Sequence, residues 1–199
     1  MQVRPCVDID EMRAAFAPIW HYFGQNPPSE DGVKHFTRVL PHERVHAGFD
    51  GERIVAGAAA FPFDLTIPGG LVKAAGITVT GVFPTHRRRG YLRALQHSLI
   101  GDARVRGEPV AVLWATEDTI YGHFGYGMAS MSAEIDVPRD RTKPFESVVS
   151  PGPTRLVPLD EAVPLVAPIY DQVARCTPGM FVRTSEWWRS GSRPAGGRR

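Results

Sequence analysis

The chain has 199 residues, of which 43% are hydrophobic and 22% are charged, and its formal net charge is +2. This length favours one full domain and part of a second, and the composition excludes a wholly disordered chain, a collagen and a coiled coil. The balance of 23 basic against 21 acidic residues argues against a protein dedicated to nucleic-acid binding, although it leaves room for a local basic patch.

The start of the sequence predicts two helices. The first covers residues 8–24, because Asp8 is a capping residue, Glu11 follows three positions later as in a capping box, and apolar residues recur at helical spacing. These apolar residues are Met12, Phe16, Ile19, Trp20 and Phe23. A second, short helix is expected after Ser29 and before Pro41.

The middle of the sequence predicts a mixed sheet. Asp50-Gly51 between two apolar runs indicates a β-hairpin. The later elements are expected as a turn at 68–70, a strand over 74–84, a helix over 90–105, a strand over 110–115, a helical turn over 118–124 and a last strand near 128–137. The continuous apolar run at 110–115 is typical of a strand buried on both faces. A hairpin followed by a β-α-β unit predicts an α/β (α+β) domain over residues 1–137.

The remaining third divides into a linker and an unfinished unit. Residues 138–153 are charged and proline-rich, which is typical of a linker. Residues 154–190 then repeat part of the N-terminus at an offset of 150, for Ala17-Pro18-Ile19-Trp20 recurs as Ala167-Pro168-Ile169-Tyr170. Because only the tail 191–199 follows, with no strands for a sheet, this unit resembles the opening of a second domain. Its helix 161–175 carries an apolar face that we expect to pack on the first domain, to recruit another chain or to cause aggregation.

The sequence also predicts a cytoplasmic protein. It contains no run of about 18 apolar residues, the length that a membrane-spanning helix needs. Acidic residues occupy the N-terminal stretch where a signal peptide would be apolar. Cys6 and Cys176 lack metal-ligand spacing, and we interpret them as free thiols in a reducing compartment.

One candidate anion site lies where a strand passes through a basic turn into a helix. Residues 77–96 read ITVTGVFPTHRRRGYLRALQ. The first turn of such a helix has N–H groups without intrahelical acceptors, and arginine matches phosphate geometry. The alternative is a solvated basic turn. Neither a Walker loop nor a G-x-G-x-x-G pattern is present.

A second candidate segment, LWATEDTIYGHFGYG, follows the strand at 110–115. Open sheets place ligands at such strand ends. Glu117 and Tyr121 would share a helical face, where tyrosine can donate a proton to a leaving group and glutamate can accept one from an amine. The alternative is that Tyr121, Phe124 and Tyr126 are packing aromatics.

His42-Glu43-Arg44-Val45-His46 matches the zinc-protease pattern H-E-x-x-H. That chemistry needs both histidines on one helical face, about 6 Å apart. Pro41 precedes this segment and a turn follows it, so we expect an extended strand, in which four residues span roughly 13 Å. We therefore predict no metal site.

Together, the two segments resemble the GNAT acetyltransferase superfamily, and specifically the branch of the enhanced intracellular survival (Eis-like) proteins. The GNAT pattern [QR]-x-x-G-x-[GA] reads here Arg87-Arg88-Arg89-Gly90-Tyr91-Leu92 and departs from the pattern at its last position. The resemblance implies a GNAT fold followed by an incomplete second GNAT-like unit, with acetyl-CoA as co-substrate. It assigns the cofactor to Thr80, Gly81, Val82, Arg87, Arg88, Arg89, Gly90, Tyr91, Leu92, Arg93, Thr116 and Glu117. It assigns protonation of the CoA thiolate to Tyr121 and a place in the acceptor pocket to Phe36.

The implied reaction is direct acetyl transfer to a primary amine of an aminoglycoside, a polyamine or a lysine side chain. Family members resemble a chain about twice as long, whose terminal carboxylate serves as the base. This chain ends at Arg199, which leaves Glu117 as the nearby carboxylate and leaves turnover open. A non-catalytic module that binds CoA or a protein partner is the alternative. No nucleic-acid or membrane partner is expected, and the oligomeric state stays open.

Overall fold

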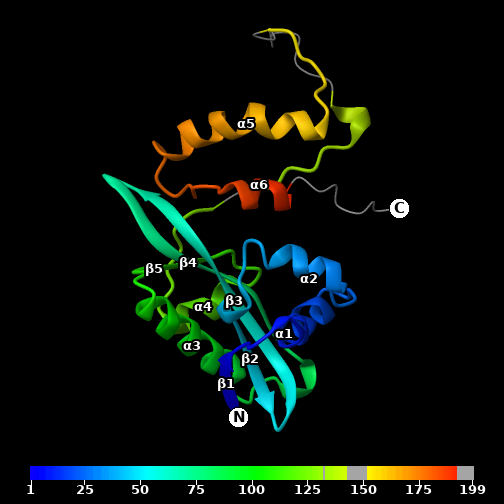
Figure 1. Ribbon diagram of the computed structural model, residues 1–199, viewed down its shortest axis with the longest axis vertical. Helices are drawn as coiled ribbons and strands as arrows, with labels where there is room; N and C mark the ends of the chain where they lie inside the picture. The colour runs from blue at the N-terminus through cyan, green and yellow to red at the C-terminus, as the bar shows by residue number, and fades with distance from the viewer. Residues whose placement is uncertain (132, 143–151, 192–199) are drawn as a thin grey trace.

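A five-stranded mixed sheet forms the centre of the computed structural model, which describes residues 1–131, 133–142 and 152–191 (Figure 1). The strands are β1 (Gln2–Pro5), β2 (Val45–Asp50), β3 (Arg53–Ile67), β4 (Gly70–Val82) and β5 (Val110–Leu113). They lie in the order β1-β2-β3-β4-β5, with antiparallel pairing from β1 to β4 and parallel pairing of β5 with β4. The predicted mixed α/β fold is confirmed.

The helices are α1 (Ile9–Tyr22), α2 (Glu30–Phe36), α3 (Tyr91–Val105), α4 (Asp118–Tyr121), α5 (Leu159–Ala174) and α6 (Ser185–Gly191). Helix α1 packs on one face of the sheet and α3 on the other. The predicted cap of α1 is present, because Asp8 Oδ1 accepts the N–H of Glu11 at 2.8 Å. In the parts of the chain that the structure describes, no helix has the length and apolar character to cross a membrane.

Two glycines let α1 lie directly on the sheet. A Cβ placed on Gly57 of β3 would stand 1.9 Å from the carbonyl oxygen of Ala15, and one on Gly81 of β4 would stand 2.6 Å from the amide nitrogen of Ile19. Phe16 and Met12 of α1 are buried in the core on this side of the sheet. On the other side, Leu95 and Leu99 of α3 form a second core. The close approach of α1 brings its C-terminal end beside β4.

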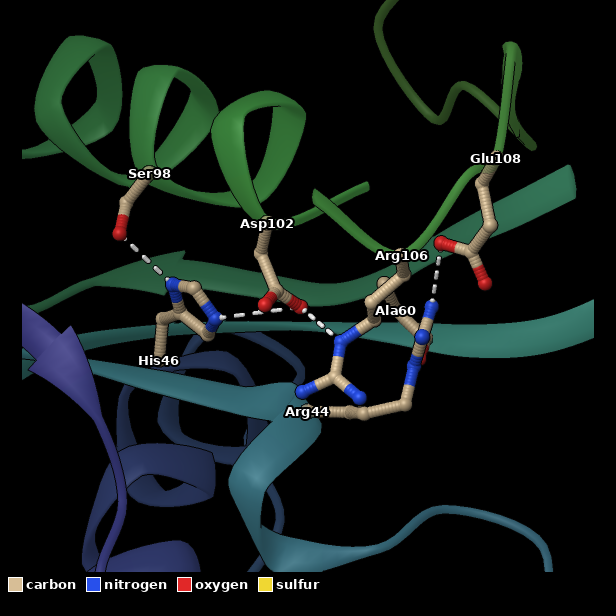
Figure 2. Close-up of polar contacts among 7 residues, drawn as sticks. All are labelled: Arg44, His46, Ala60, Ser98, Asp102, Arg106 and Glu108. Atoms are coloured by element: carbon tan, nitrogen blue, oxygen red, sulfur yellow. Dashed lines mark hydrogen bonds and ion pairs between the residues drawn. The ribbon is translucent and has the colours of Figure 1, made fainter. Parts of the chain in front are cut away.

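A buried ion pair fastens the sheet to the segment after α3. Arg44 Nε donates to the carbonyl of Ala60 at 2.7 Å, and its Nη2 donates to Glu108 Oε2 at 2.8 Å (Figure 2). Both charged side chains are buried. Because an unpaired charge is costly in this environment, the two residues hold β3 and the segment after α3 together.

A second polar group beneath α3 centres on His46 of β2 (Figure 2). Its Nδ1 lies 2.8 Å from Ser98 Oγ, and its Nε2 lies 3.9 Å from Asp102 Oδ2, which accepts a hydrogen bond from Arg106 Nε at 2.7 Å. Burial lowers the pKa of His46 below its ordinary value of 6.5, against an opposing effect of Asp102. The neutral imidazole thus joins α3 to the sheet.

The C-terminal unit packs on the far end of the hairpin formed by β3 and β4 (Figure 1). Thr66 Oγ1 donates to the carbonyl of Ala174 at 2.7 Å, where α5 ends. Phe181 stacks on Phe63 at a centroid distance of 4.3 Å, and Trp187 of α6 packs edge-on against the same ring at 5.3 Å. The packing on the first domain that we expected of helix 161–175 is therefore present only at its C-terminal end, because Leu165, Val166 and Ile169 are 44%, 44% and 64% exposed. Recruitment of another chain and aggregation stay predictions. Most of the predicted linker (143–151) and nearly all of the tail (192–199) lie outside the described residues.

Two expectations at the end of the sheet are wrong. Residues 127–131 and 133–138 carry no strand, and Met131 and Ile135 are 84% and 81% exposed. Apolar and polar residues do alternate here, but a strand needs a hydrogen-bonding partner, and no described segment pairs with this one. For the same reason β5 is the edge of the described sheet, so it is half-buried rather than buried on both faces.

Candidate active site

The site begins where β4 and β5 separate. Parallel pairing with β5 ends at Ile77, although β4 continues to Val82. Against β3, one extra residue is inserted in β4 between Thr78 and Gly81, and Val79 adopts a left-handed φ of 45°. Such a bulge bends the strand and redirects its backbone groups. The predicted positions Thr80, Gly81 and Val82 thus lie on a part of β4 that no described strand pairs with on the β5 side.

A cleft of about 250 Å³ lies beside this bend. It is lined by Ile19, Phe23, Ile77, Thr78, Val79, Thr80, Leu113, Trp114, Thr116 and Tyr121. The structure thereby brings the predicted residues Thr80, Thr116 and Tyr121 together. Ile19 of α1 and Phe23, which directly follows α1, were predicted only as members of the apolar stripe of the first helix.

Phe36 lies apart from the cleft lining. Its ring packs edge-on against Phe16 of α1, with centroids 5.9 Å apart, at the edge of the core between α1 and α2. Its predicted place in an acceptor pocket therefore stays a prediction.

The arginine loop leads into α3. Arg88 and Gly90 have left-handed φ values of 60° and 88°, and Gly90 caps α3 without a side chain. The first N–H groups of α3 consequently have neither intrahelical acceptors nor a side-chain cap. Arg87, Arg89 and Arg88 are exposed around them. Unfilled donors, the helix dipole and arginine side chains in one place favour a phosphate.

Tyr91, the first residue of α3, has only its backbone available to this site. Its side chain is buried, its ring lies where a Cβ on Gly48 would stand, and its hydroxyl donates to the carbonyl of Phe49 at 3.1 Å. The ring therefore fixes the start of α3 on β2. Leu92 is half-buried and Arg93 is exposed on the same turn.

Tyr22, the last residue of α1, links the two predicted segments and was missed by the sequence analysis. Its hydroxyl donates to Glu117 Oε1 at 3.2 Å, and the guanidinium of Arg87 lies 5.8 Å from its ring centroid. These contacts join the arginine loop to the loop after β5. No local pattern could reveal them, because the three residues meet only through the tertiary fold.

Tyr121 lies at the end of α4 and is half-buried in the cleft wall. Burial, followed by the charge of Glu117, raises the pKa of its phenol above 10. The phenol is therefore protonated at neutral pH and can donate a proton. Its ring meets the ring of Tyr126 edge-on, with centroids 5.9 Å apart.

The zinc-protease pattern is extended only in its last two residues, so the expected strand over the whole segment is wrong for His42–Arg44. His42 begins a single 3-10 turn (His42–Arg44), and His46 lies in β2, so the two imidazoles do not share a helical face. Within the ranges that the structure covers, no three His, Cys, Asp or Glu side chains gather as a metal site would need.

Comparison with known families identifies the class of this fold. The family described as acetyltransferase (GNAT) domain matches residues 4–129, and the chain belongs to this family.

Its relatives confirm the resemblance to the Eis-like branch. A Streptomyces avermitilis protein named as an uncharacterized N-acetyltransferase is 42% identical over 149 residues, which are 71% of this chain and 35% of that protein. The N-acetyltransferase Eis of Mycobacterium tuberculosis is 37% identical over 147 residues, 69% of this chain and 36% of Eis. The crystal structure of Eis1 from Mycobacterium abscessus superposes with a TM-score of 0.73 and 31% identity, covering 95% of this chain and 47% of Eis1. The chain thus spans about a third of the length of the two curated relatives that it matches in sequence.

Proposed function

We propose that this chain binds acetyl-CoA and transfers its acetyl group to a primary amine. The observation that carries the proposal is the position of a protonated tyrosine, Tyr121, in a cleft where β4 and β5 separate. After β4 the chain passes through a 3-10 turn (Pro84–His86) and the arginine loop to the phosphate-compatible start of α3. The names of the relatives as N-acetyltransferases support the same reaction.

The residues present fit the donor. The uncapped first turn of α3 and the guanidinium groups of Arg87, Arg88, Arg89 and Arg93 would hold the diphosphate. The backbone of residues 80–82, which no described strand pairs with on the β5 side, would bond the pantetheine amides in the manner of an added strand. Thr116 and Glu117 would bound the arm on the β5 side. Acetyl-CoA supplies an activated thioester carbonyl to this cleft.

The chain's own groups would then move the protons. As the amine nitrogen bonds to the acetyl carbon and the carbon–sulfur bond breaks, Tyr121 donates its phenolic proton to the departing sulfur. The amine must attack in its neutral form, so a second group has to accept its proton. Glu117 can do so directly or through water, and a proton returning from solvent restores Tyr121.

One observation favours the second candidate, a module that binds CoA without turnover. Within the described residues no carboxylate lines the cleft, and Glu117 already accepts a hydrogen bond from Tyr22. Binding and turnover must therefore be measured separately.

The test combines acetyl-CoA titration with thiol detection of released CoA in the presence of a polyamine, an aminoglycoside or a lysine peptide. Tyr121→Phe should abolish release and leave binding intact. Arg87→Ala with Arg88→Ala should weaken binding by on the order of 2–4 kcal/mol, since each change removes a charge-assisted contact. Arg104→Ala, an exposed arginine at the other end of α3, is the matched control. Binding without release from any acceptor would favour the second candidate, and unchanged affinity in the double variant would refute the diphosphate site.

A further inference from the structure

A polar side chain interrupts the buried apolar face of α3. Gln96 is fully buried, as are its neighbours on that face, Leu95 and Leu99. Its Oε1 accepts a hydrogen bond from the hydroxyl of Tyr126 at 3.3 Å, while its Nε2 has no partner in the described structure. Tyr126 thus reaches from the loop after α4 to the helix that begins at the phosphate site.

Tyr126 is also in contact with the proposed proton donor. Its ring meets that of Tyr121 edge-on, and burial, together with a smaller effect of Tyr121, raises the pKa of Tyr126 to about 12. Tyr126 is therefore a neutral hydroxyl at every pH at which the enzyme would work, and it donates to Gln96 throughout that range.

The backbone around Tyr121 provides little support of its own. Helix α4 has four residues and no side-chain cap, and it continues into a single 3-10 turn (Gly122–Phe124) that ends at Gly125 with a left-handed φ of 89°. A segment this short does not hold a side chain rigidly. The place of the Tyr121 ring therefore depends on what packs against it, which includes the ring of Tyr126.

The hydrogen bond between Tyr126 and Gln96 adds little to stability. A neutral hydrogen bond contributes little net stability, and a buried donor left without a partner costs a similar amount or more. Replacing both partners by apolar groups of similar shape is close to neutral. Packing of α3 alone therefore does not require a glutamine at position 96.

We propose that Gln96 and Tyr126 are positioning residues, which hold the phenol of Tyr121 at a fixed place relative to the start of α3. This inference rests on the proposed function, because the start of α3 holds the donor's diphosphate and Tyr121 protonates its sulfur. Positioning of this kind matters because a displacement of about 1 Å between reacting groups can cost on the order of 100-fold in rate.

The test compares Tyr126→Phe, Gln96→Leu and the double variant with the unchanged protein. Tyr126→Phe keeps the ring and removes the hydroxyl, and we expect kcat to fall by about 10- to 100-fold. Acetyl-CoA affinity should stay within about twofold, since no phosphate contact is altered. The double variant should unfold at the same denaturant concentration as the unchanged protein, or at a higher one, yet be as slow as either single variant. Tyr170→Phe is the matched control, because Tyr170 donates to the carbonyl of Phe181 at 2.7 Å in the C-terminal unit.

A second measurement does not depend on turnover. The ionisation of Tyr121 follows from tyrosinate absorbance after subtraction of the same variant carrying Tyr121→Phe. Loss of the Tyr126 hydroxyl should free the ring to reach solvent and shift its ionisation toward pH 10. If the unchanged protein binds acetyl-CoA but releases none, the proposed function fails, and this titration still decides the positioning role. Unchanged ionisation of Tyr121 in Tyr126→Phe, or turnover equal to that of the unchanged protein, would overturn the inference.

Discussion

Helices α1 and α5 share a short sequence repeat at an offset of 150 but have opposite environments. Phe16 of α1 is 1% exposed, whereas Val166, its counterpart in α5, is 44% exposed. Ile169, the counterpart of a residue that lines the cleft, is 64% exposed. Both helices form, and each contains a proline at the same place in the repeat. An apolar stripe thus makes a face for packing and does not itself supply the neighbour.

The two helices differ in the elements that contact them. Helix α1 meets β3 and β4 at two glycines, so its backbone touches the sheet. No described strand lies against α5 in that way; it is attached at its C-terminal end, through Thr66 and through the bond from Tyr170 to Phe181 (Figure 1). Its middle turns therefore contribute little buried area.

The largest expected effect comes from truncating the paired positions. Phe16→Ala should lower the free energy of unfolding by about 3–5 kcal/mol, because a buried ring leaves a cavity. Val166→Ala removes a side chain that is already partly in water, and it should cost less than about 1 kcal/mol. Urea unfolding of both variants measures the difference. Equal losses would mean that α5 is buried as deeply as α1.

The glycine contact of α1 can be broken directly. Gly57→Ala places a methyl group against the backbone of Ala15 and should cost about 3 kcal/mol, at the upper end of what overpacking usually costs. Gly101→Ala is the matched control, because Gly101 is an exposed helical residue of α3 with open space around its Cα. That change should stabilise the chain by about 0.5–1 kcal/mol. A mild effect of Gly57→Ala would show that α1 can lift from the sheet.

Acid should destabilise the first unit through a group that the C-terminal unit lacks, because His46 is buried in the first unit and residues 152–191 contain no histidine. The pKa of His46 is lowered by burial, so its neutral form stabilises the fold fully above pH 6.5. That contribution is lost as the pH falls from 6.5 through the folded-state pKa. The free energy of unfolding of the unchanged chain should therefore fall more between pH 7.5 and pH 5 than that of His46→Gln. His97→Gln, an exposed histidine on α3, should leave the slope as it is; an identical slope in His46→Gln would exclude this role.

Local patterns were sufficient for most of the first unit. The cap at Asp8, the turn at Asp50-Gly51 and the periodicity of residues 90–105 each act over a few residues, and all three elements form as predicted. The strand expected near 128–137 does not form, because its apolar pattern, like that of the middle turns of α5, has no described neighbour to pair or pack with. Alternating apolar and polar residues specify which side chains of a strand share a face. Whether the strand forms depends on a neighbouring strand for its backbone hydrogen bonds, and the local sequence does not identify that neighbour.

The candidate site likewise contains residues that local patterns predict and residues that only the fold brings together. The arginine loop and Tyr121 could be found from sequence because each lies in a compact segment with a recognisable pattern. The bulge at Val79, the link from Tyr22 to Glu117 and the bond from Tyr126 to Gln96 join residues distant in sequence. Such contacts follow from strand register and helix packing, which a single sequence does not reveal.

The smallest expected effect on stability tests the exposed face of α5 itself. Leu165→Lys with Ile169→Lys puts two charges on side chains that already meet solvent, so the free energy of unfolding should change by no more than about 0.5 kcal/mol. The same face should make the unchanged chain self-associate as its concentration rises, and the lysines should suppress this in sedimentation experiments. At the counterpart of Leu165 in α1, Ala15→Lys should unfold the chain, because Ala15 is fully buried against Gly57. A loss of more than about 2 kcal/mol in the α5 variant, without any change in association, would mean that this face packs within its own chain, and the two helices would then differ in degree rather than in kind.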